Sequence, residues 1–582
     1  MKRLLQIINI ILLFYSFGFS AVNNTNAAAD SLPTIAFDEN NIVLKIGVIS
    51  DTHIQDAGAS PSTKLTNALA QLNNRADGNL DAVVISGDLT DYGKPAQVEE
   101  FKKVLDNSVV DFNKTKLIFA IGNHEYYDSQ INGAAWKGGY LFKDVLGDIA
   151  YQGAADSEIT AGDYHTVVNG QDFIVVNCSQ YDGGVHYLDS DIKWLKEKLA
   201  DAAANHPGKP IFVISHPQIT GTQIGSNEGA YWASDELKSI LKDYPQVIYL
   251  CGHMHFPEND ERSIWQGDFT TIEVGSVYYC SNVNTDEETG KLFIDISYGY
   301  VTGSAGNSSQ GLYVEVDNTG NVRVRRINFT KSQEIKKPWI VGAPKEDKSH
   351  LLYYTPEQIK KNFAGTAPVF SDGAYVKEIG KYTRGAEVYK FQFTQAKDND
   401  MVYSYQLSFI NKATDTVITT ISCLSDFYLF PNPEDMAATL LESISSANTV
   451  LAPFTLQYKE DYYLKLVALD CFGQKSEPLI SSIIDDVADD IPVVPSGINL
   501  EQNYPNPFNP STTINYSIPE NGYVTIKLYD VLGNEVKTLV NGTQEAGSHA
   551  IMLNSSDLSS GVYFYKLNAG RFTSVKKMIK LN

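Results

Sequence analysis

Five short apolar runs in the first half of the chain each end abruptly in a group of polar residues. The runs are residues 46–50, 83–86, 117–121, 211–215 and 247–251. Their β-branched and aromatic content predicts buried strands, and helical spacing of apolar residues is found between them. Alternating strands and helices indicate an α/β layered domain, in which polar groups that follow the strands collect at one edge of the sheet. We therefore expect the five polar groups to meet in space.

The polar groups carry side chains that bind metal ions. Seven of them are candidate ligands: Asp51, His53, Asp88, Asn123, His216, His253 and His255. Carboxylate, imidazole and amide groups without a thiolate favour manganese, iron or zinc. Seven ligands exceed the needs of one tetrahedral ion and suit two ions that share a bridging carboxylate. Each motif alone is weak evidence, but five of the ten histidines lie in these motifs.

The order of the motifs carries a resemblance to a known family. Asp-x-His, Gly-Asp-x-x-Asp, Gly-Asn-His-Glu, His and Gly-His-x-His, in that order, resemble the calcineurin-like metallophosphoesterase superfamily. The resemblance covers about residues 43–330 and implies a two-sheet αββα sandwich with a dinuclear metal centre at the strand ends. It implies that one ion is held by Asp51, His53 and His255, and the other by Asn123, His216 and His253. Asp88 would bridge the two ions.

The same resemblance implies a mechanism. A metal-bridging hydroxide would attack a phosphate monoester or diester, and His124 would act as general acid on the leaving oxygen. The Asp91 carboxylate would orient His124, since a neighbouring carboxylate selects the tautomer of an imidazole. A helix or turn cap is the other interpretation of Asp91. Glu125 is expected to support the loop, and Tyr127 either walls the pocket or packs within the loop.

Departures from relatives narrow the subfamily. Protein phosphatases of this superfamily continue with Arg-Gly after the second aspartate, whereas Tyr92 and Gly93 stand here. Purple acid phosphatases have a tyrosine ligand where this chain has Asp91. The chain is therefore more similar to the bacterial phosphodiesterase-like branch, and a monoester and a diester substrate both stay open.

The length of 582 residues predicts several domains. Lys2, Arg3 and an apolar run to about residue 19 predict a signal peptide over 1–29, and no later stretch is apolar enough to span a bilayer. The metallophosphoesterase domain is expected at 43–335. Alternating apolar residues predict a fibronectin- or immunoglobulin-like β-sandwich at 344–484. An acidic, proline-bearing linker follows at 485–496.

The final module, residues 497–582, is expected to be a small β-sandwich. Its segments at 500–510, 524–533 and 560–567 resemble the type A C-terminal sorting domain of the type IX secretion system. That resemblance implies passage through the outer membrane and a secreted or surface-attached protein, with the secretion machinery as a partner. An adhesive sandwich that binds glycan or protein is the alternative. A surface-binding protein built on an inactive metallophosphoesterase scaffold is the corresponding alternative for the whole chain.

Charge and cysteine content exclude other classes. The net charge of −23 argues against binding to nucleic-acid polymers or anionic lipid. Five cysteines are an odd number and cannot all pair, although Cys423 and Cys471 lie in one segment and could do so. A small phosphate ester is the substrate class that the metallophosphoesterase resemblance implies.

Overall fold

A computed structural model of the chain describes residues 32–481 and 498–580 apart from short internal gaps. The gaps are 57–59, 128–137, 153–161, 179–183, 228–232, 281–283, 287–290, 294–307, 364–365, 384–386, 399, 426–438, 445–461, 501, 504–505, 507, 509–510, 519–520, 545–546, 555–557 and 571. The predicted signal peptide (1–29) and linker (485–496) lie outside the described residues. None of the helices in the described ranges combines the length and the apolar character needed to cross a membrane.

The first sheet of the N-terminal unit has seven strands. Its order is β16-β15-β14-β1-β2-β3, and β17 pairs with β15. The strands are β1 (Ile42–Ile49), β2 (Ala82–Ser86), β3 (Lys116–Ala120), β14 (Gln310–Asp317), β15 (Val322–Asn328), β16 (Gln333–Glu334) and β17 (Trp339–Val341). β1, β2 and β3 are parallel, whereas β14 joins β1 antiparallel. The three parallel strands therefore direct their carboxyl ends to one edge.

The second sheet has six strands in the order β10-β11-β9-β6-β5-β4. They are β4 (Tyr164–Val168), β5 (Gln171–Val175), β6 (Ile211–Ile214), β9 (Val247–Cys251), β10 (Ile264–Gln266) and β11 (Thr270–Glu273). The inner strands β5, β6, β9 and β11 are parallel, and the edge strands pair antiparallel. Short two-stranded pairs add β7 (Gln218–Ile219) with β8 (Ala233–Ser234) and β12 (Asn284–Asp286) with β13 (Lys291–Phe293).

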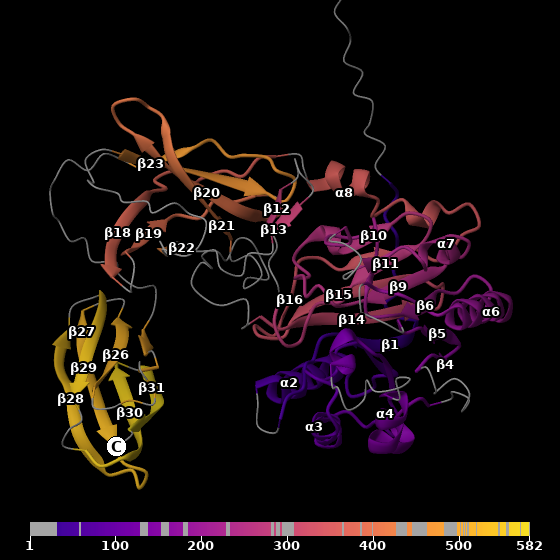
Figure 1. The fold of residues 1–582 in the computed structure, drawn as a ribbon, viewed down its shortest axis with the longest axis horizontal. Coiled ribbons are helices and arrows are strands. Elements are labelled where there is room, and N and C mark those ends of the chain that lie inside the picture. The colour runs from indigo at the N-terminus through magenta and orange to yellow at the C-terminus, as the bar shows by residue number, and fades with distance from the viewer. Residues whose placement is uncertain are drawn as a thin grey trace, which may run out of the picture. The chain divides into compact units, whose positions relative to one another are not determined.

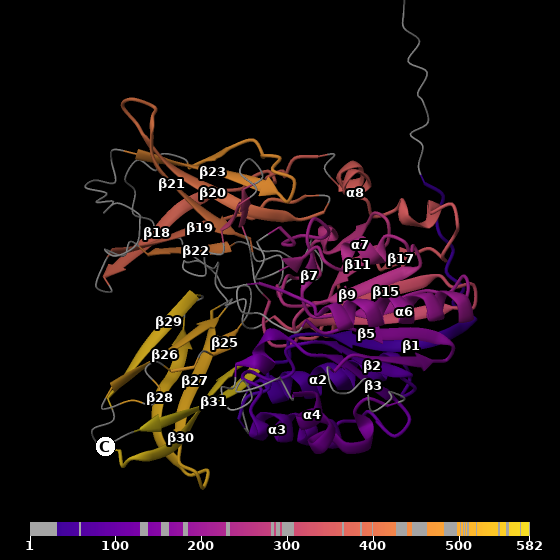
Figure 2. The ribbon, with the colours of Figure 1, turned by 45° about the vertical axis from the view of Figure 1, so that its right-hand side comes forward.

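The two sheets pack against each other and helices cover their outer faces. Along β6, Phe212 and Ile214 belong to the core between the sheets, whereas Ile211 and Val213 pack with Leu195 of helix α6. Both faces of the strand are thus buried, which explains its continuous apolar sequence. Helices α2 (Ser60–Arg75), α3 (Pro95–Asp106), α4 (Gly138–Leu146) and α6 (Asp189–Asn205) flank the sheets (Figures 1 and 2), and α7 (Lys238–Leu241) is shorter. The predicted αββα class is confirmed.

The expected accessory sandwich is present in the same compact unit, which spans Met1–Ser482. One sheet contains β18 (Val376–Thr383), β19 (Glu387–Phe393) and β22 (Thr439–Ile444). The other contains β21 (Val417–Leu424), β20 (Val402–Asn411), β23 (Tyr462–Asp470) and β24 (Leu479–Ile480), and helix α8 (Pro356–Phe363) precedes the sandwich. Cys471 has a free thiol, and the side chain of Cys423 lies outside the described residues.

Buried charges join the sandwich to the two-sheet domain. Arg262 binds the Asp260 carboxylate through Nε and Nη2, and its Nη1 donates to the Cys471 main-chain oxygen at 2.8 Å. The guanidinium lies 5.5 Å from the ring centre of Tyr403. Lys336 pairs with the carboxylate of Asp400, which is buried. We call these groups the charged seam; because buried ion pairs need matched partners, the seam specifies how the two domains dock.

The C-terminal compact unit, Ile483–Asn582, has a core of its own. One sheet contains β25 (Asn499–Leu500), β26 (Ser511–Ile518) and β29 (Gly547–Asn554); the other contains β28 (Glu535–Gln544), β27 (Gly522–Tyr529), β30 (Gly561–Ala569) and β31 (Phe572–Lys580). All pairs are antiparallel, as expected for a small β-sandwich. The exact domain limits stay predictions.

Candidate metal centre

The candidate ligands follow the carboxyl ends of five parallel strands, three in the first sheet and two in the second. Main-chain hydrogen bonds bring neighbouring strand ends together: His53 N donates to Asp88 O at 3.0 Å, and Gly252 N donates to His216 O at 3.0 Å. Asp51 and His53 follow β1, Asp88 follows β2, Asn123 and His124 follow β3, His216 follows β6, and His253 and His255 follow β9. The structure therefore places all these residues at one edge of the double sheet.

Asp88 lies at the centre of this group. Its Oδ2 atom is 3.1 Å from His216 Nε2 and 3.8 Å from His53 Nε2. The same oxygen is 3.9 Å from His124 Nε2, and the other carboxylate oxygen accepts a hydrogen bond from His124 N at 3.0 Å. Three imidazoles from three different strands thus surround one carboxylate.

Asp51 is the second buried carboxylate of the centre. Its Oδ1 atom lies 3.1 Å from His255 Nε2 and 3.9 Å from His216 Nε2, and its Oδ2 accepts from His253 N at 3.2 Å. Three groups of potential ligand atoms result, each within 4.8 Å: Asp51, His53, Asp88 and His255; Asp88, His216 and His253; and His53, Asp91 and His124. Asp88 belongs to the first two groups. The assignment of each side chain to a particular ion stays a prediction.

Asn123 stands beside Asp88 because its chain neighbours Gly122 and His124 both adjoin that carboxylate. Its amide nitrogen donates to the Tyr127 hydroxyl at 2.7 Å. This hydrogen bond leaves the amide oxygen as the atom that can bind a cation. Tyr127 therefore orients a candidate ligand, a role that neither of the two interpretations of its sequence position, lining the pocket or packing within the loop, included.

The donor atoms fit a bound cation. Within the described residues, Asp51 Oδ1, His53 Nδ1 and His216 Nε2 are buried and form no hydrogen bond. An unsatisfied buried polar group costs about 1–3 kcal/mol. His216 Nδ1 lies 2.7 Å from the Ser86 carbonyl oxygen, to which it donates in the neutral ring, so its Nε2 lone pair faces Asp88. A lone pair opposite a carboxylate is favourable only with positive charge between them, which a metal ion or, without metal, a proton on Nε2 provides.

The pKa values of the site reflect the same charge pattern. Burial opposes the imidazolium form of His216, yet Asp88 and Asp51 raise the pKa of His216 to about 9. Burial lowers the pKa of His53 to about 3, which keeps this ring neutral and able to bind metal. Although burial opposes its ionisation, His216 holds the pKa of Asp88 well below its usual range. The buried carboxylates of the site thus stabilise positive charge on the groups beside them.

Five of the candidate ligands have left-handed backbone. The φ angles are 52° at Asp51, 43° at His53, 50° at Asp88, 76° at His253 and 58° at His255. This conformation costs roughly 1–2 kcal/mol for a residue with a Cβ atom. Such backbone strain clusters at functional sites, where the surrounding fold holds it. The backbone conformation that directs these side chains inward therefore lowers the stability of the folded protein.

Two glycines explain why ligands follow Gly in the motifs. Gly87 has a φ of 102°, and a Cβ atom there would lie 2.3 Å from His216 Nδ1. A Cβ atom on Gly122 would lie 2.0 Å from Asp88 Oδ1. Any larger residue would push one strand end away from the next. The glycines thus permit the close approach that the centre requires.

His124 lies at the centre but is more exposed than the candidate ligands. Its side chain is 26% exposed, whereas that of His216 is 0% exposed. His124 Nδ1 lies 2.8 Å from the main-chain oxygen of Asp91 and 3.7 Å from the Asp91 carboxylate oxygen Oδ1. The group at hydrogen-bond distance from the His124 ring is thus the main-chain carbonyl group of Asp91, whereas the expected partner, the Asp91 carboxylate, lies farther away. The loop backbone itself orients the ring.

Glu125 supports the loop, as expected. Its carboxyl group accepts from Thr90 N at 2.7 Å and from Gly122 N at 2.9 Å. Burial and the neighbouring Asp88 raise the pKa of Glu125 to about 8. Away from the centre, His165 and His206 both bind Asp172, and His186 binds Glu236 at the surface.

Tyr278 and Tyr279 were not singled out from the sequence. The Tyr279 carbonyl oxygen lies 2.9 Å from His255 Nδ1, and its ring lies 4.2 Å from that of His255. The Tyr278 ring lies 5.7 Å from that of His53. Both tyrosines follow β11, a short strand of sequence Thr-Thr-Ile-Glu without an apolar run. Its parallel pairing with β9 makes it a further strand end at the centre.

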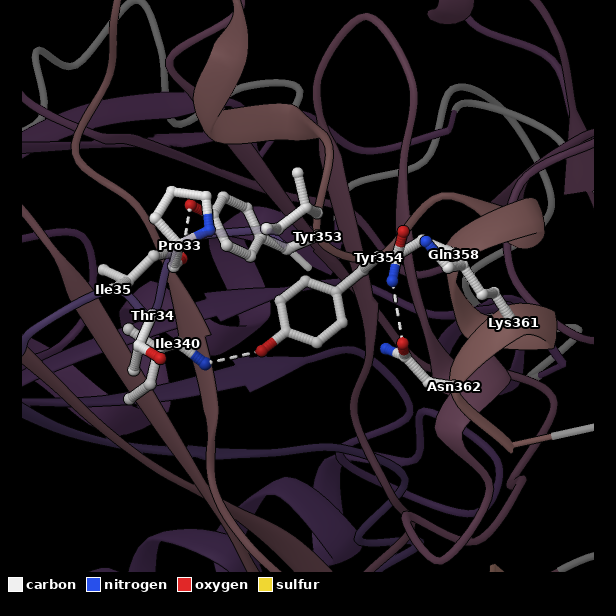
Figure 3. Close-up of a pocket in the computed structure, with 10 residues that line it drawn as sticks. Pro33, Thr34, Ile35, Ile340, Tyr353, Tyr354, Gln358, Lys361 and Asn362 are labelled. Atoms are coloured by element: carbon white, nitrogen blue, oxygen red, sulfur yellow. Dashed lines mark hydrogen bonds between the residues drawn. The ribbon is translucent and has the colours of Figure 1, made fainter. Parts of the chain in front are cut away.

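A separate pocket of about 390 Å³ lies between residues 32–35 and helix α8 (Figure 3). The Tyr354 hydroxyl accepts from Ile340 N at 2.7 Å on its wall, and Gln358 donates to Asn362 at 2.7 Å. Its lining contains none of the candidate site residues. The pocket therefore does not belong to the metal centre.

Comparison with known proteins agrees with this architecture. Residues 44–257 match the calcineurin-like phosphoesterase family, and residues 502–581 match the secretion system C-terminal sorting domain. The chain thus contains a metallophosphoesterase domain with a buried cluster of histidine and aspartate side chains. More particularly, the chain combines a calcineurin-like metallophosphoesterase domain with a C-terminal sorting domain of a secretion system.

One curated relative is a probable cyclic nucleotide phosphodiesterase of Rhodococcus erythropolis, 25% identical over 219 residues. The match covers 36% of this chain and 64% of the relative, so this chain spans less than two thirds of the length of the relative. Similar solved structures include a purple acid phosphatase from yellow lupin (Lupinus luteus) seeds, with 14% identity, TM-score 0.35 and coverage of 54% of this chain and 55% of that one. A fibronectin type III segment of chicken tenascin has 12% identity, TM-score 0.11, and coverage of 37% and 98% respectively.

Proposed function

We propose that this protein is a secreted dinuclear metallophosphoesterase that hydrolyses a phosphate monoester or diester. The observation that supports this most strongly is the convergence of buried ligand atoms from five strand ends around Asp88. The chemistry that a bound pair of manganese, iron or zinc ions supplies is acidification of a water molecule and neutralisation of the phosphoryl oxygens.

The other roles in the reaction, which are metal binding, orientation and proton transfer, belong to side chains of the protein. The Asp88 carboxylate lies between the imidazoles of His53 and His216 and is placed to serve both ion positions. His124 Nδ1 donates to the Asp91 carbonyl group, so the ring carries a proton at Nε2, and can act as the acid there, in its doubly protonated form. Because its side chain is partly exposed, His124 can reach the leaving oxygen and protonate it. His216 and His255 are oriented by the carbonyl groups of Ser86 and Tyr279.

Removal of metal tests this proposal directly. Exhaustive treatment with a chelator is expected to abolish hydrolysis of p-nitrophenyl phosphate and bis(p-nitrophenyl) phosphate, because no described side chain of the centre replaces the ions. Addition of manganese should restore turnover and bring the metal content to about two ions per chain. Metal is counted by mass spectrometry and turnover by absorbance. Activity that survives complete removal of metal would refute a metal-dependent hydrolase.

A comparison of the rates at which different esters are hydrolysed would identify the substrate class. The relative named as a probable cyclic nucleotide phosphodiesterase makes cyclic nucleotides first candidates, with phosphomonoesters as the other group. Tyr92 in place of an arginine argues against phosphoproteins. The alternative, an inactive scaffold used for surface binding, is disfavoured because all seven candidate ligand positions and His124 carry competent side chains.

The C-terminal unit is proposed to direct the protein through the type IX secretion machinery to the cell surface or the medium. Truncation after Pro492, in a bacterium that has this machinery, is expected to leave active enzyme in the periplasm. Because the C-terminal unit and the N-terminal unit have separate cores, the truncated enzyme should keep its fold. Enzyme assays on cell fractions check the result. Normal export with altered surface binding would instead indicate an adhesive module.

A further inference from the structure

Two tyrosine rings lie at the exposed side of the metal centre. Tyr92 is 47% exposed and Tyr127 is 43% exposed, although both are large aromatic residues. The Tyr127 ring centre lies 4.6 Å from that of His124, and the Tyr92 ring centre lies 6.3 Å from that of Tyr127. The two residues come from different loops, one after β2 and one after β3. We call this pair the tyrosine rim.

The tyrosine rim is held in place by groups of the centre and its loops. The Tyr127 hydroxyl accepts the hydrogen bond from the Asn123 amide, and the Tyr92 main-chain nitrogen donates to Gln97 Oε1 at 2.9 Å. Lys94 lies over the Tyr92 ring, with its ammonium group 4.9 Å from the ring centre. The rim thus offers aromatic surface and one positive charge, which suits an anionic ester that carries a ring.

The position of the rim indicates which part of a substrate it would contact. In the proposed function, on which this inference rests, His124 protonates the leaving oxygen, so the leaving group lies on the His124 side of the centre. Tyr127 packs beside His124 on that side. Tyr278 and Tyr279 pack instead against His53 and His255 and are less exposed.

We propose that the tyrosine rim selects phosphate esters whose leaving group carries a planar ring, as in a nucleoside. Stacking of the ring on Tyr92 and Tyr127 would bind such a leaving group, because aromatic faces gain favourable contacts with any nucleobase. A sugar phosphate or a phosphorylated serine lacks this ring and gains no stacking. Tyr92 and Tyr127 are then specificity-determining residues.

Matched ester pairs test the proposal because they share the leaving oxygen and differ only in the ring. The first pair is adenosine 5′-monophosphate and ribose 5-phosphate. The second is adenosine 3′,5′-cyclic phosphate and the 3′,5′-cyclic phosphate of methyl riboside. With manganese present, the full-length protein is expected to show a kcat/KM at least roughly tenfold higher for the ring-bearing member of the pair that it hydrolyses. The preference should arise mainly in KM.

Two variants of Tyr92 sharpen the test. Tyr92→Ala is expected to reduce the preference for the ring-bearing ester roughly tenfold, whereas Tyr92→Phe keeps the ring and should keep the preference. Tyr523→Ala, at an exposed tyrosine of the C-terminal unit, is the matched control and should not change the preference. Metal content and the midpoint of thermal unfolding show whether each variant is folded.

The outcomes separate this inference from the proposed function. Equal kcat/KM values for both members of a pair in the unmodified protein would overturn the inference and leave the phosphoesterase proposal intact. An equal loss for both members in Tyr92→Ala would overturn it too. Failure of the metal-loaded protein to hydrolyse any of the four esters or an aryl ester would overturn the proposed function and the inference together.

Discussion

Asp88→Asn is expected to empty the metal centre and to lower kcat/KM by a factor on the order of 1,000 or more, as loss of a main electrostatic group does in other enzymes. The substitution keeps the shape of the side chain but removes its negative charge. In the structure the carboxylate is buried and lies within 3.9 Å of three imidazole nitrogens. The charge that would hold two cations close together is then lost. Metal content by mass spectrometry and kcat/KM on an aryl phosphate ester measure the effect.

Asp106→Asn is the matched control for this change. Asp106 lies on helix α3, where its half-exposed carboxylate pairs with Lys102. Surface ion pairs of this kind contribute about 0–1 kcal/mol, so the control should keep both its metal and its turnover. An Asp88→Asn protein that still binds two ions would show that Asp88 is not the bridging ligand.

His124→Ala is expected to have the opposite signature: the metal content stays and kcat falls roughly 100- to 10,000-fold, the usual range for loss of a general acid. His124 is partly exposed, and its Nδ1 is held by the Asp91 carbonyl group rather than directed at a ligand position. The loss should be much smaller for a p-nitrophenyl ester than for an alkyl ester, because p-nitrophenolate leaves without a proton. Turnover of the two esters and metal content are measured on the same preparation.

His186→Ala serves as the control for the loss of a histidine. His186 is exposed, binds Glu236 and belongs to none of the groups of potential ligand atoms among the described residues. Its replacement should change neither turnover nor metal content. Loss of metal in His124→Ala would assign His124 to the ligands, and an equal loss of turnover for alkyl and aryl esters would argue against a proton donor.

The strand ends of the centre could be predicted from the sequence because both faces of their strands are buried. Phe212 and Ile214 face the other sheet while Ile211 and Val213 face a helix, so the strand is apolar throughout and its polar end is conspicuous. β11 lacks that signal, since Thr270 and Thr271 are polar although buried. Tyr278 and Tyr279, which follow it, were missed for that reason.

The details of orientation depend on backbone geometry that a motif does not contain. A sequence with Asp91 and His124 suggests a carboxylate–imidazole contact, because side chains are what a motif displays. The structure places the carbonyl group of Asp91 nearer, at 2.8 Å from Nδ1. The left-handed φ angles at Asp51 and Asp88 likewise follow from the convergence of strands far apart in the chain. The charged seam joins residues more than 200 positions apart, such as Arg262 and Cys471, and no local pattern announces it.

The charged seam also limits how this architecture can be recombined. A sandwich from another protein could replace residues 344–484 only if it offered a carboxylate for Lys336 and both a ring and a carbonyl group for Arg262. Without them, the Lys336 ammonium group would lose its carboxylate partner, and Arg262 would keep Asp260 but lose the acceptor of its Nη1, which is destabilising. The C-terminal unit shares no core cluster with the N-terminal unit among the described residues, so its apolar core imposes no such condition. We therefore expect that the C-terminal unit can be exchanged easily between such chains, whereas exchange of the sandwich is difficult.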